Sequence, residues 1–372
     1  MVHEIDVVVI GGGQSGLAVG YFLRRTPHSF VILDAASEPG GAWLHGWNSL
    51  RLFSPAEASS LPGWPMPRQV AAEDGGFPKK DEVVSYLTAY ETRYSLPVER
   101  PVRVDSITRD HEHYLIHTDG GVWRAGAVIC ATGTWTKPYS PTYPGLATYT
   151  GFQVHSAAYT GPEPFAGRRV LIVGGGNSGA QLLAEVSKVA TTVWVTLTEP
   201  TYLPDDVDGR VLFNRASQQY QAVQAGEAAT PIRSLGAIVM VPSMKEARDR
   251  GVLKAVRPFE SFTLTGVRWA DSSPNGAPSG REEAFDAIIW CTGFQPAIDY
   301  LRPLGVLDEG GRVATDGTRA TQLPGLWLVG FGAWTGFASA TIIGVGRSAR
   351  ATVGQVTAYL QQRTQPASVT HS

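Results

Sequence analysis

The apolar positions along the chain form two kinds of pattern, and their alternation predicts an α/β fold. Runs of four or five consecutive apolar residues are typical of strands that are buried on both faces of a parallel sheet. Such runs stand at Val7–Ile10, Phe30–Leu33, Ala127–Ala131, Val170–Val173 and Ala287–Cys291. Stretches with helical periodicity separate them, and we expect helices over Gln14–Arg25, from an N-cap at Asp81 to Tyr94, and over Ser339–Leu360.

Two of the buried runs lead into the same glycine-rich turn. Residues 11–16 read GGGQSG and residues 174–179 read GGGNSG, each directly after a strand and directly before a helical pattern. In a GxGxxG turn the first glycine permits the bend, the second lets a pyrophosphate approach the backbone, and the third lets helix and strand pack closely. Two such turns predict two bound dinucleotides, most simply a flavin and a nicotinamide coenzyme. The predicted contacts are Gly11, Gly13, Gln14, Ser15 and Gly16 for the flavin, and Gly174, Gly176, Asn177, Ser178 and Gly179 for the coenzyme.

An acidic residue follows the first turn at the distance expected for a ribose contact. Asp34 ends the strand Phe30–Leu33, 18 residues after Gly16, where a carboxylate bonds a ribose hydroxyl, although an acid at a strand end is also a common turn former. The same count from Gly179 reaches Leu197, beside Thr198, so we expect no charged group at that position and weak discrimination between NADH and NADPH. Glu199 follows two residues later, and a shift of one turn would bring it close. Further flavin contacts are expected at Gly41 and Trp43, in a second glycine turn that can also be an ordinary loop, and at Val104.

The predicted domain organisation follows from a repeat of strand ends. Ala127–Ala131 and Ala287–Cys291 are both closed by Thr-Gly, each about 110 to 120 residues after the start of a glycine turn. The second nucleotide-binding unit is therefore inserted into the first domain, to which a strand at Leu326–Val329 returns. We expect residues 1–140 and 286–372 to form the FAD domain, 141–163 a linker, and 164–285 the NAD(P) domain, with an insertion at about 201–266 that shapes access to the site. Short segments near residues 102–104, 114–116 and 122–123 predict a hairpin layer.

Composition and charge exclude several classes of protein. A formal net charge of -2 leaves no basic surface for nucleic acid or an anionic membrane, and no apolar segment is long enough to span a bilayer. Cys130 and Cys291 are the two cysteines, which argues against a disulfide framework and favours the cytoplasm. No metal site is expected, because His111 and His113 have no nearby ligand cluster and the run 205–210 lacks the distal Glu of a calcium loop.

At this point the residues resemble a known family, the class B flavin-containing monooxygenases. The family's linker motif is FxGxxxHxxx followed by an aromatic residue, and residues 149–159 here, YTGFQVHSAAY, match it at Gly151, His155 and Tyr159. The resemblance covers nearly the whole chain and is closest to short bacterial members. It implies two Rossmann-like domains arranged as in glutathione reductase.

The resemblance also implies an activity. FAD would be reduced by NADPH or NADH, O₂ would add to give a C4a-hydroperoxyflavin, and one oxygen atom would pass to a small soft nucleophile, a thioether sulfur or an amine nitrogen. Tyr159 in place of tryptophan favours heteroatom oxygenation over Baeyer–Villiger oxidation of ketones. One departure concerns an active-site Asn of the family, expected after Leu52-Phe53-Ser54-Pro55; here Asn48 precedes that segment.

Other interpretations of the same motifs remain open. An NAD(P)H oxidase or reductase would reduce the flavin without transferring oxygen, and a flavin-binding sensor would not turn over at all. A disulfide reductase needs a pair of redox cysteines beside the flavin, whereas Cys130 and Cys291 lie far apart in the sequence. His155 is either a link between the domains and a contact of the coenzyme or a structural hydrogen-bonding group. The substrate and a homodimeric state stay undecided by sequence.

Overall fold

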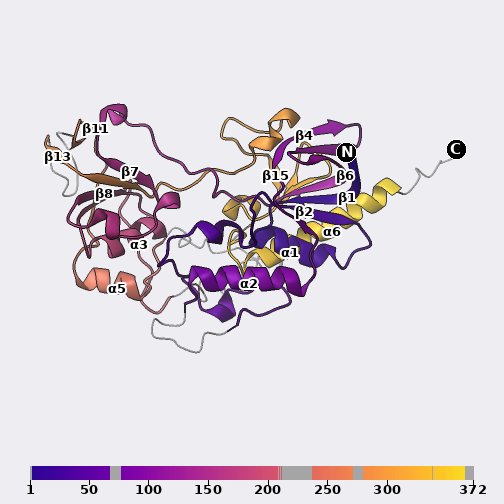
Figure 1. Ribbon diagram of the computed structural model, residues 1–372, viewed down its shortest axis with the longest axis horizontal. Helices are drawn as coiled ribbons and strands as arrows, with labels where there is room; N and C mark the ends of the chain where they lie inside the picture. Colours follow the sequence, from indigo (N-terminus) through magenta and orange to yellow (C-terminus); the bar gives the residue numbers. More distant parts are fainter. Residues whose placement is uncertain are drawn as a thin grey trace, which may run out of the picture.

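The computed structural model describes residues 2–67, 77–207, 209, 211, 237–270, 280–336 and 338–364. These residues form two lobes, each built on its own sheet, and two connecting segments run between them (Figure 1). Among the helices in the described part of the chain, none is both long and apolar enough to cross a membrane.

The first lobe contains a sheet with the strand order β15-β16-β17-β6-β1-β2-β3. Its parallel strands carry the predicted apolar runs, and alternate residues of β1 pack on opposite faces: Val7 and Val9 against the helices, Val8 and Ile10 against the hairpin side. Burial on both faces explains why these runs are continuously apolar. The parallel strands are β1 (Val2–Ile10), β2 (Phe30–Leu33), β3 (Val98–Glu99), β6 (Gly121–Cys130) and β17 (Leu326–Leu328).

Helices and a hairpin cover the two faces of this sheet. The helices α1 (Gln14–Leu23), α2 (Lys80–Arg93) and α6 (Val345–Thr364) share one apolar core with it. The opposite face carries β4 (Val104–Asp110) and β5 (His113–Thr118). Two short antiparallel strands, β15 (Thr315–Asp316) and β16 (Arg319–Ala320), extend the edge beside β17.

Some predicted elements of the first lobe have different bounds in the structure. Residues 121–130 form the single strand β6 instead of a hairpin strand and a separate central strand. The first half of β6 pairs with β5 and the second half with β17, and β1 pairs with both halves, so the strand is continuous. Asp81 is not the N-cap of α2: Lys79 is, and its N–H donates to Glu82 Oε2 at 2.7 Å. The last helix begins at Val345 instead of near Ser339, whose hydroxyl bonds Gly332 O in the preceding turn.

The second lobe is a smaller unit of the same design. Its parallel sheet has the order β10-β9-β8-β14-β7, with β7 (Phe152–His155), β8 (Arg169–Val173), β9 (Thr191–Val195), β10 (Ala255–Val256) and β14 (Ala287–Trp290). The helices α3 (Asn177–Val186) and α5 (Pro242–Asp249) pack on one face. An antiparallel sheet of β11 (Ser261–Phe262), β12 (Gly266–Arg268) and β13 (Glu282–Ala284) covers the other. Short 3₁₀ helices complete the described chain at Gly41–His45, Ala56–Ala58, Leu146–Thr148, Ser156–Ala158, Glu163–Phe165, Asp299–Leu304 and Gly332–Thr335.

The pairing of β14 moves one expected domain boundary. The chain was expected to re-enter the first domain at residue 286, but β14 lies between β7 and β8 of the second sheet, so the chain leaves that lobe only after Cys291. By the same pairing, β7 belongs to the second sheet although it falls within the expected linker 141–163. An apolar strand closed by Thr-Gly looks alike in either lobe, so its sheet could be assigned only from the pairing.

The two connecting segments are hydrogen-bonded to each other. Tyr139 N–H donates to Gly293 O at 2.9 Å, and Gln295 N–H donates to Lys137 O at 2.8 Å. Trp135 of one segment stacks on Phe294 of the other, with ring centroids 5.1 Å apart. The lobes are thus joined by a paired two-segment bridge, and both segments begin at the Thr-Gly strand ends.

Candidate functional site

In each glycine turn, the first and third glycines are required by contacts within the protein. Gly11 has φ +107°, and a Cβ there would lie 2.6 Å from Ala131 O. A Cβ at Gly16 would overlap Gly11 O, because α1 crosses the end of β1 at that point. The second turn repeats this geometry: Gly174 has φ +135° and lies against Cys291 O, and Gly179 lies against Gly174 O.

The middle glycine of each turn faces open space instead. A Cβ at Gly13 would find its nearest neighbour, Gly41 Cα, at 3.7 Å, and one at Gly176 would find no atom within 4 Å. Both residues have ordinary negative φ and are the N-caps of α1 and α3, without side-chain capping bonds. The space therefore opens in front of free N–H groups at two helix N-termini, which is the geometry that suits a pyrophosphate.

The structure brings several predicted flavin-site residues together around the first turn. Trp43 Nε1 donates to Gln14 Oε1 at 2.9 Å, and Gln14 Nε2 donates to Ala340 O at 2.6 Å. Gly41, with φ +57°, lies against Gly13, where a Cβ would approach Cα to 2.7 Å. Three segments that are distant in sequence thus meet at this helix start.

Val104, the last predicted flavin contact, lies further from this helix start. It is paired with Thr118 at the start of β4. It follows Val102 by two residues, and the N–H of Val102 donates to Asp34 O.

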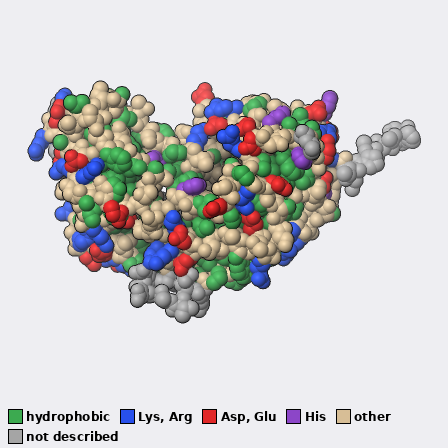
Figure 2. All heavy atoms as spheres, in the orientation of Figure 1, with side chains coloured by type: hydrophobic (Ala, Val, Ile, Leu, Met, Phe, Trp, Pro, Cys, Tyr) green, Lys and Arg blue, Asp and Glu red, His purple; other side chains and the backbone are tan. Residues whose placement is uncertain are grey.

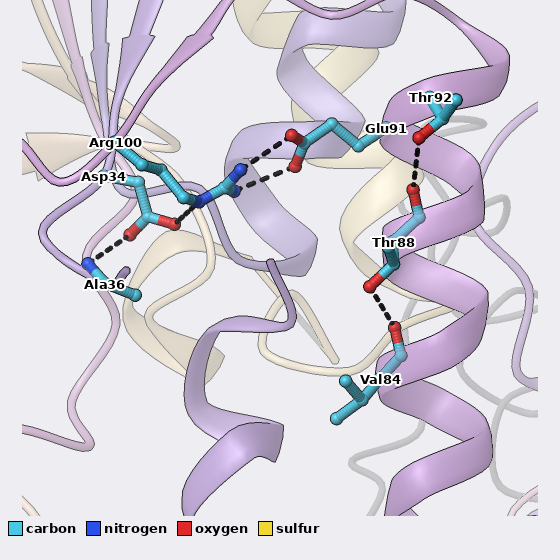
Figure 3. Close-up of polar contacts among 7 residues, drawn as sticks. All are labelled: Asp34, Ala36, Val84, Thr88, Glu91, Thr92 and Arg100. Atoms are coloured by element: carbon cyan, nitrogen blue, oxygen red, sulfur yellow. Dashed lines mark hydrogen bonds and ion pairs between the residues drawn. The ribbon is translucent and has the colours of Figure 1, made fainter. Parts of the chain in front are cut away.

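Asp34 lies directly beside the first turn. Its side chain is only 10% exposed, and a Cβ on Gly12 would come within 2.5 Å of its Oδ2. The carboxylate accepts the Nε–H of Arg100 at 2.9 Å and, more weakly, the N–H of Ala36 at 3.4 Å (Figure 3). The predicted ribose contact, Asp34, therefore lies beside Gly12, the residue before Gly13, and is already paired with Arg100.

The second lobe places a different group at the matching position. In the first lobe, Asp34 N–H donates to Glu99 O at 3.0 Å, and the side chain of Asp34 lies against Gly12. In the second lobe, Thr196 N–H donates to Val256 O at 3.0 Å, and the side chain of Thr196 lies against Gly175. The structural counterpart of Asp34 is therefore Thr196, not Leu197, which is 83% exposed. Thr198 is exposed as well, and its carbonyl accepts the hydroxyl of Thr196 at 2.8 Å.

Arg257 was missed by sequence reasoning. It follows β10 directly, as Arg100 follows β3, and donates to Thr196 O at 3.2 Å and to Glu199 Oε2 at 2.8 Å. The expectation that no charged group lies at this strand end is wrong. Arg257 is about 60 residues away in the sequence, and only the pairing of β10 with β9 brings it there.

Two of the three linker-motif residues lie at the edge of the second lobe, His155 against the bridge and Tyr159 against Trp47 of the first lobe, whereas Gly151 precedes β7 at the strand's other end. His155 Nδ1 accepts the N–H of Ala157 at 3.1 Å, so its Nε2–H donates to Gly293 O, also at 3.1 Å. Burial lowers the pKa of His155, which keeps the ring neutral at pH 7 and satisfied by these two bonds. Tyr159 is buried against Phe165, and a Cβ on Gly151 would overlap the Tyr149 hydroxyl. Of these residues His155 bonds the bridge, whereas the buried hydroxyl of Tyr159 has no hydrogen-bond partner within the described part of the chain.

A cavity of about 320 Å³ lies between the lobes. Ser49 of the first lobe donates to Glu185 Oε2 of α3 at 2.8 Å in its wall, and burial raises the pKa of Glu185. Nearby, Gly209 N–H donates to Phe53 O, so the expected insertion contacts the segment Leu52–Pro55. The described lining residues are Trp47, Ser49, Leu50, Arg51, Leu52, Phe77, Gln181, Ala184, Glu185, Lys188, Val241, Pro242 and Ser243.

The remaining histidine and aspartate candidates from the sequence lie beside charged neighbours. His113 pairs with Arg124, His111 lies near Asp110, and Asp205 forms an ion pair with Arg248. Asp208 and Arg210 of the run 205–210 lie outside the described residues. Among the described residues there is no group of three or more His, Cys, Asp or Glu side chains that could hold a metal ion.

A family model for pyridine nucleotide-disulphide oxidoreductases matches residues 8–214, which is more than half of the chain. The chain belongs to this family. A solved flavin-containing monooxygenase from Stenotrophomonas maltophilia is 52% identical, with a TM-score of 0.86, over 96% of this chain and 99% of that one. The uncharacterised oxidoreductase CzcO of Bacillus velezensis is 30% identical over 94% of this chain and 99% of its own length. An indole-3-pyruvate monooxygenase of Oryza sativa subsp. japonica is 26% identical over 92% of this chain and 89% of its own.

These relatives confirm the resemblance to flavin-containing monooxygenases and the paired nucleotide-binding fold. The protein is an oxidoreductase of the flavin monooxygenase type, whose members use FAD, a nicotinamide coenzyme and O₂. The name of the wider family includes disulphide reduction, for which the two cysteines here are unsuited. Cys130 and Cys291 are both free and buried, with exposed fractions of 0% and 8%, the first at the end of β6 and the second directly after β14.

We expect both thiols to be unreactive in the folded protein. Burial raises the pKa of Cys130 and of Cys291 to about 12, so neither forms a thiolate at pH 8. A chromogenic disulfide reagent should therefore titrate no thiol in native protein at pH 8 and both after unfolding. Rapid reaction of either cysteine in the native state would contradict this and revive a redox role.

The glycine geometry predicts that two matched substitutions in the second lobe differ in their effect on the stability of the fold. Gly179→Ala places a methyl group against Gly174 O and should destabilise the protein by about 1–3 kcal/mol. Gly176→Ala enters open space at a permitted φ and should change stability by no more than about 0.5 kcal/mol. Thermal unfolding without coenzyme measures both, and equal losses of Tm would show that the open space is filled by packing.

Proposed function

We propose that FAD binds at the first glycine turn and the nicotinamide coenzyme at the second, and that the protein transfers one oxygen atom to a thioether sulfur or an amine nitrogen. The observation that supports this is the matched pair of helix starts, each with open space at its middle glycine. The two strand ends beside them differ: Asp34, paired with Arg100, stands at the first, whereas the neutral Thr196, bonded by Arg257, stands at the second. An acid suits ribose hydroxyls, whereas an arginine suits a 2′-phosphate.

The residues present fit the proposed flavin. Gly13, Gln14 and Ser15 would hold the pyrophosphate at the start of α1, Asp34 would bond the adenosine ribose, and Gly41 and Trp43 would flank the same space. FAD, when bound and reduced by the coenzyme, supplies the oxygen-activating chemistry. The protein's own tasks are to orient substrate and coenzyme and to exclude water.

The second turn fits the coenzyme in the same way. Gly176, Asn177 and Ser178 would hold the coenzyme pyrophosphate at the start of α3. Asn177 is itself fixed, because its Oδ1 accepts the N–H of Val239 at 2.9 Å. His155 would act as a structural link of the bridge, since both of its ring nitrogens are already bonded.

The cavity between the lobes supports a small, largely apolar substrate. Seven of its thirteen described lining residues are apolar and six are polar or charged, so apolar surface is combined with groups that can orient a ligand, as is usual for small-molecule sites. It also borders Leu52, at the start of the segment Leu52-Phe53-Ser54-Pro55, after which the resemblance places an active-site Asn. We infer that substrates enter along this cavity, and that Baeyer–Villiger oxidation of a ketone is the second activity to examine.

The product distinguishes oxygen transfer from its alternatives. With NADPH, air and an aryl methyl thioether, we expect sulfoxide to form in proportion to the NADPH consumed, and chiral chromatography measures it. A linear ketone in the same assay tests for ester formation. NADPH consumption with only hydrogen peroxide as product would show an oxidase, and no consumption at all would show a flavin-binding sensor.

Arg257 should set the preference between the two coenzymes. Its pairing with Glu199 offsets its charge, so we expect the wild-type ratio of kcat/KM for NADPH and NADH to be about 30-fold or less, equivalent to about 2 kcal/mol. Arg257→Ala should lower kcat/KM for NADPH about 10- to 100-fold and leave NADH nearly unchanged, because a charge-assisted bond to the 2′-phosphate is lost. Arg248→Ala, which breaks an exposed ion pair in the same lobe, is the control. An unchanged ratio in Arg257→Ala would remove Arg257 from the coenzyme site.

Two further properties remain predictions. The two buried free thiols favour a reducing compartment, so we infer a cytoplasmic location. The oligomeric state is open between a monomer and a homodimer, and sedimentation of the purified protein would distinguish them.

A further inference from the structure

Arg100 connects Asp34 to helix α2 (Figure 3). Its Nε donates to Asp34 Oδ2 at 2.9 Å, and its two terminal nitrogens donate to the two carboxylate oxygens of Glu91 at 2.6 and 2.8 Å. The side chains are 10% exposed for Arg100, 10% for Asp34 and 18% for Glu91. A two-pronged arginine–carboxylate pair fixes the plane of the guanidinium, so Arg100 cannot turn without breaking three bonds.

The position of Asp34 is restrained from several sides. Its N–H donates to Glu99 O at 3.0 Å, and its carbonyl accepts the N–H of Val102 at 2.8 Å. Its Oδ2 is held between Gly12 and Arg100. Among the described residues its Oδ1 accepts one hydrogen bond, from the N–H of Ala36 at the long distance of 3.4 Å. A carboxylate oxygen accepts about two hydrogen bonds, so Oδ1 retains capacity for a ligand hydroxyl.

The second lobe shows that this arrangement is not simply part of the shared fold. Arg257 occupies the place of Arg100, directly after the edge strand, but it bonds the backbone carbonyl of Thr196 and the exposed Glu199. In the first lobe, the arginine instead bonds two nearly buried carboxylates. The first strand end thus holds two acids and one arginine, and the second holds one acid and one arginine.

We propose that Arg100, backed by Glu91, is a positioning residue that fixes the Asp34 carboxylate so that Oδ1 accepts hydrogen bonds from the ribose hydroxyls of the FAD adenosine. This rests on the assignment of FAD to the first glycine turn. Arg100 itself does not touch the cofactor. Substitution of Arg100 should therefore weaken the hydrogen bonds between Asp34 and the adenosine ribose hydroxyls, and it should leave contacts to the rest of the flavin unchanged.

A competition between two flavins tests this. Holoenzyme is equilibrated with equal amounts of FAD and an analogue whose adenosine ribose lacks both hydroxyls, and the bound flavins are quantified by chromatography. We expect the wild type to prefer FAD about tenfold, the range of one or two hydrogen bonds. The double variant Arg100→Gln with Glu91→Gln removes the arginine without leaving Glu91 as an unpaired charge, and its two amide side chains can still hydrogen-bond. Asp34 loses its fixed cationic partner, so the variant should lose most of this preference. Arg100→Lys keeps the charge without the planar fork, so its preference should be intermediate.

Binding of FMN and a matched arginine provide the controls. FMN lacks the adenosine, so its affinity should be the same in the wild type and the double variant. Arg124→Gln removes an arginine of the same lobe, in an ion pair with Glu4, and should keep the tenfold preference.

The outcomes separate the two proposals. If Asp34→Ala abolishes the preference but the Arg100 and Glu91 double variant retains it, the positioning role of Arg100 is wrong. Tighter FAD binding by the double variant would also overturn it, because Arg100 would then compete with the ribose. If Asp34→Ala retains the full preference, the adenosine ribose is not read at this strand end, and the assignment of FAD to the first turn fails.

Discussion

The close approach of a helix to the end of a strand is the constraint on which the rest of this structure depends. At Gly16 and at Gly179 the helix backbone comes so near the preceding strand end that no side chain fits. This contact directs the N-termini of α1 and α3 toward the carboxyl ends of their sheets, with unpaired N–H groups facing outward. The middle glycines, Gly13 and Gly176, then leave room for a ligand backbone to approach those groups.

The unit of strand, glycine turn and helix occurs twice, and this repetition gives the molecule two lobes with one nucleotide-binding turn each. Each lobe builds one parallel sheet behind its turn, and the chain crosses between the lobes at the two Thr-Gly strand ends (Figure 1). The space-filling view shows the two lobes side by side with a recess in the outline between them (Figure 2). The lobes differ most at the strand ends beside the turns, where Asp34 is clamped by Arg100 and Thr196 is bound by Arg257. That difference in charge is the physical basis for giving the two lobes different dinucleotides.

The sequence was informative wherever one local pattern decided the structure. Continuous apolar runs predicted the central strands, and the glycine spacing predicted both turns and the residues that line them. The sequence was uninformative where a distant pairing decided. The strand at Ala287–Trp290 has the same pattern in either sheet, and only its pairing with β7 and β8 assigns it to the second lobe. Arg257 likewise reaches Thr196 through the pairing of β10 with β9, across a stretch that no fixed spacing spans.

The central claim is the order of the two sites, and a matched pair of substitutions tests it most directly. Gly13→Val and Gly176→Val each place a branched side chain before one helix start, at a position where a Cβ itself meets no close contact in the protein. The measurement is the flavin content of each purified variant together with the rate at which NADPH reduces the bound flavin under anaerobic conditions. We predict that Gly13→Val loses flavin, and that Gly176→Val keeps it but is reduced far more slowly than the wild type. Loss of flavin from Gly176→Val, with rapid reduction of the flavin in Gly13→Val, would contradict the account.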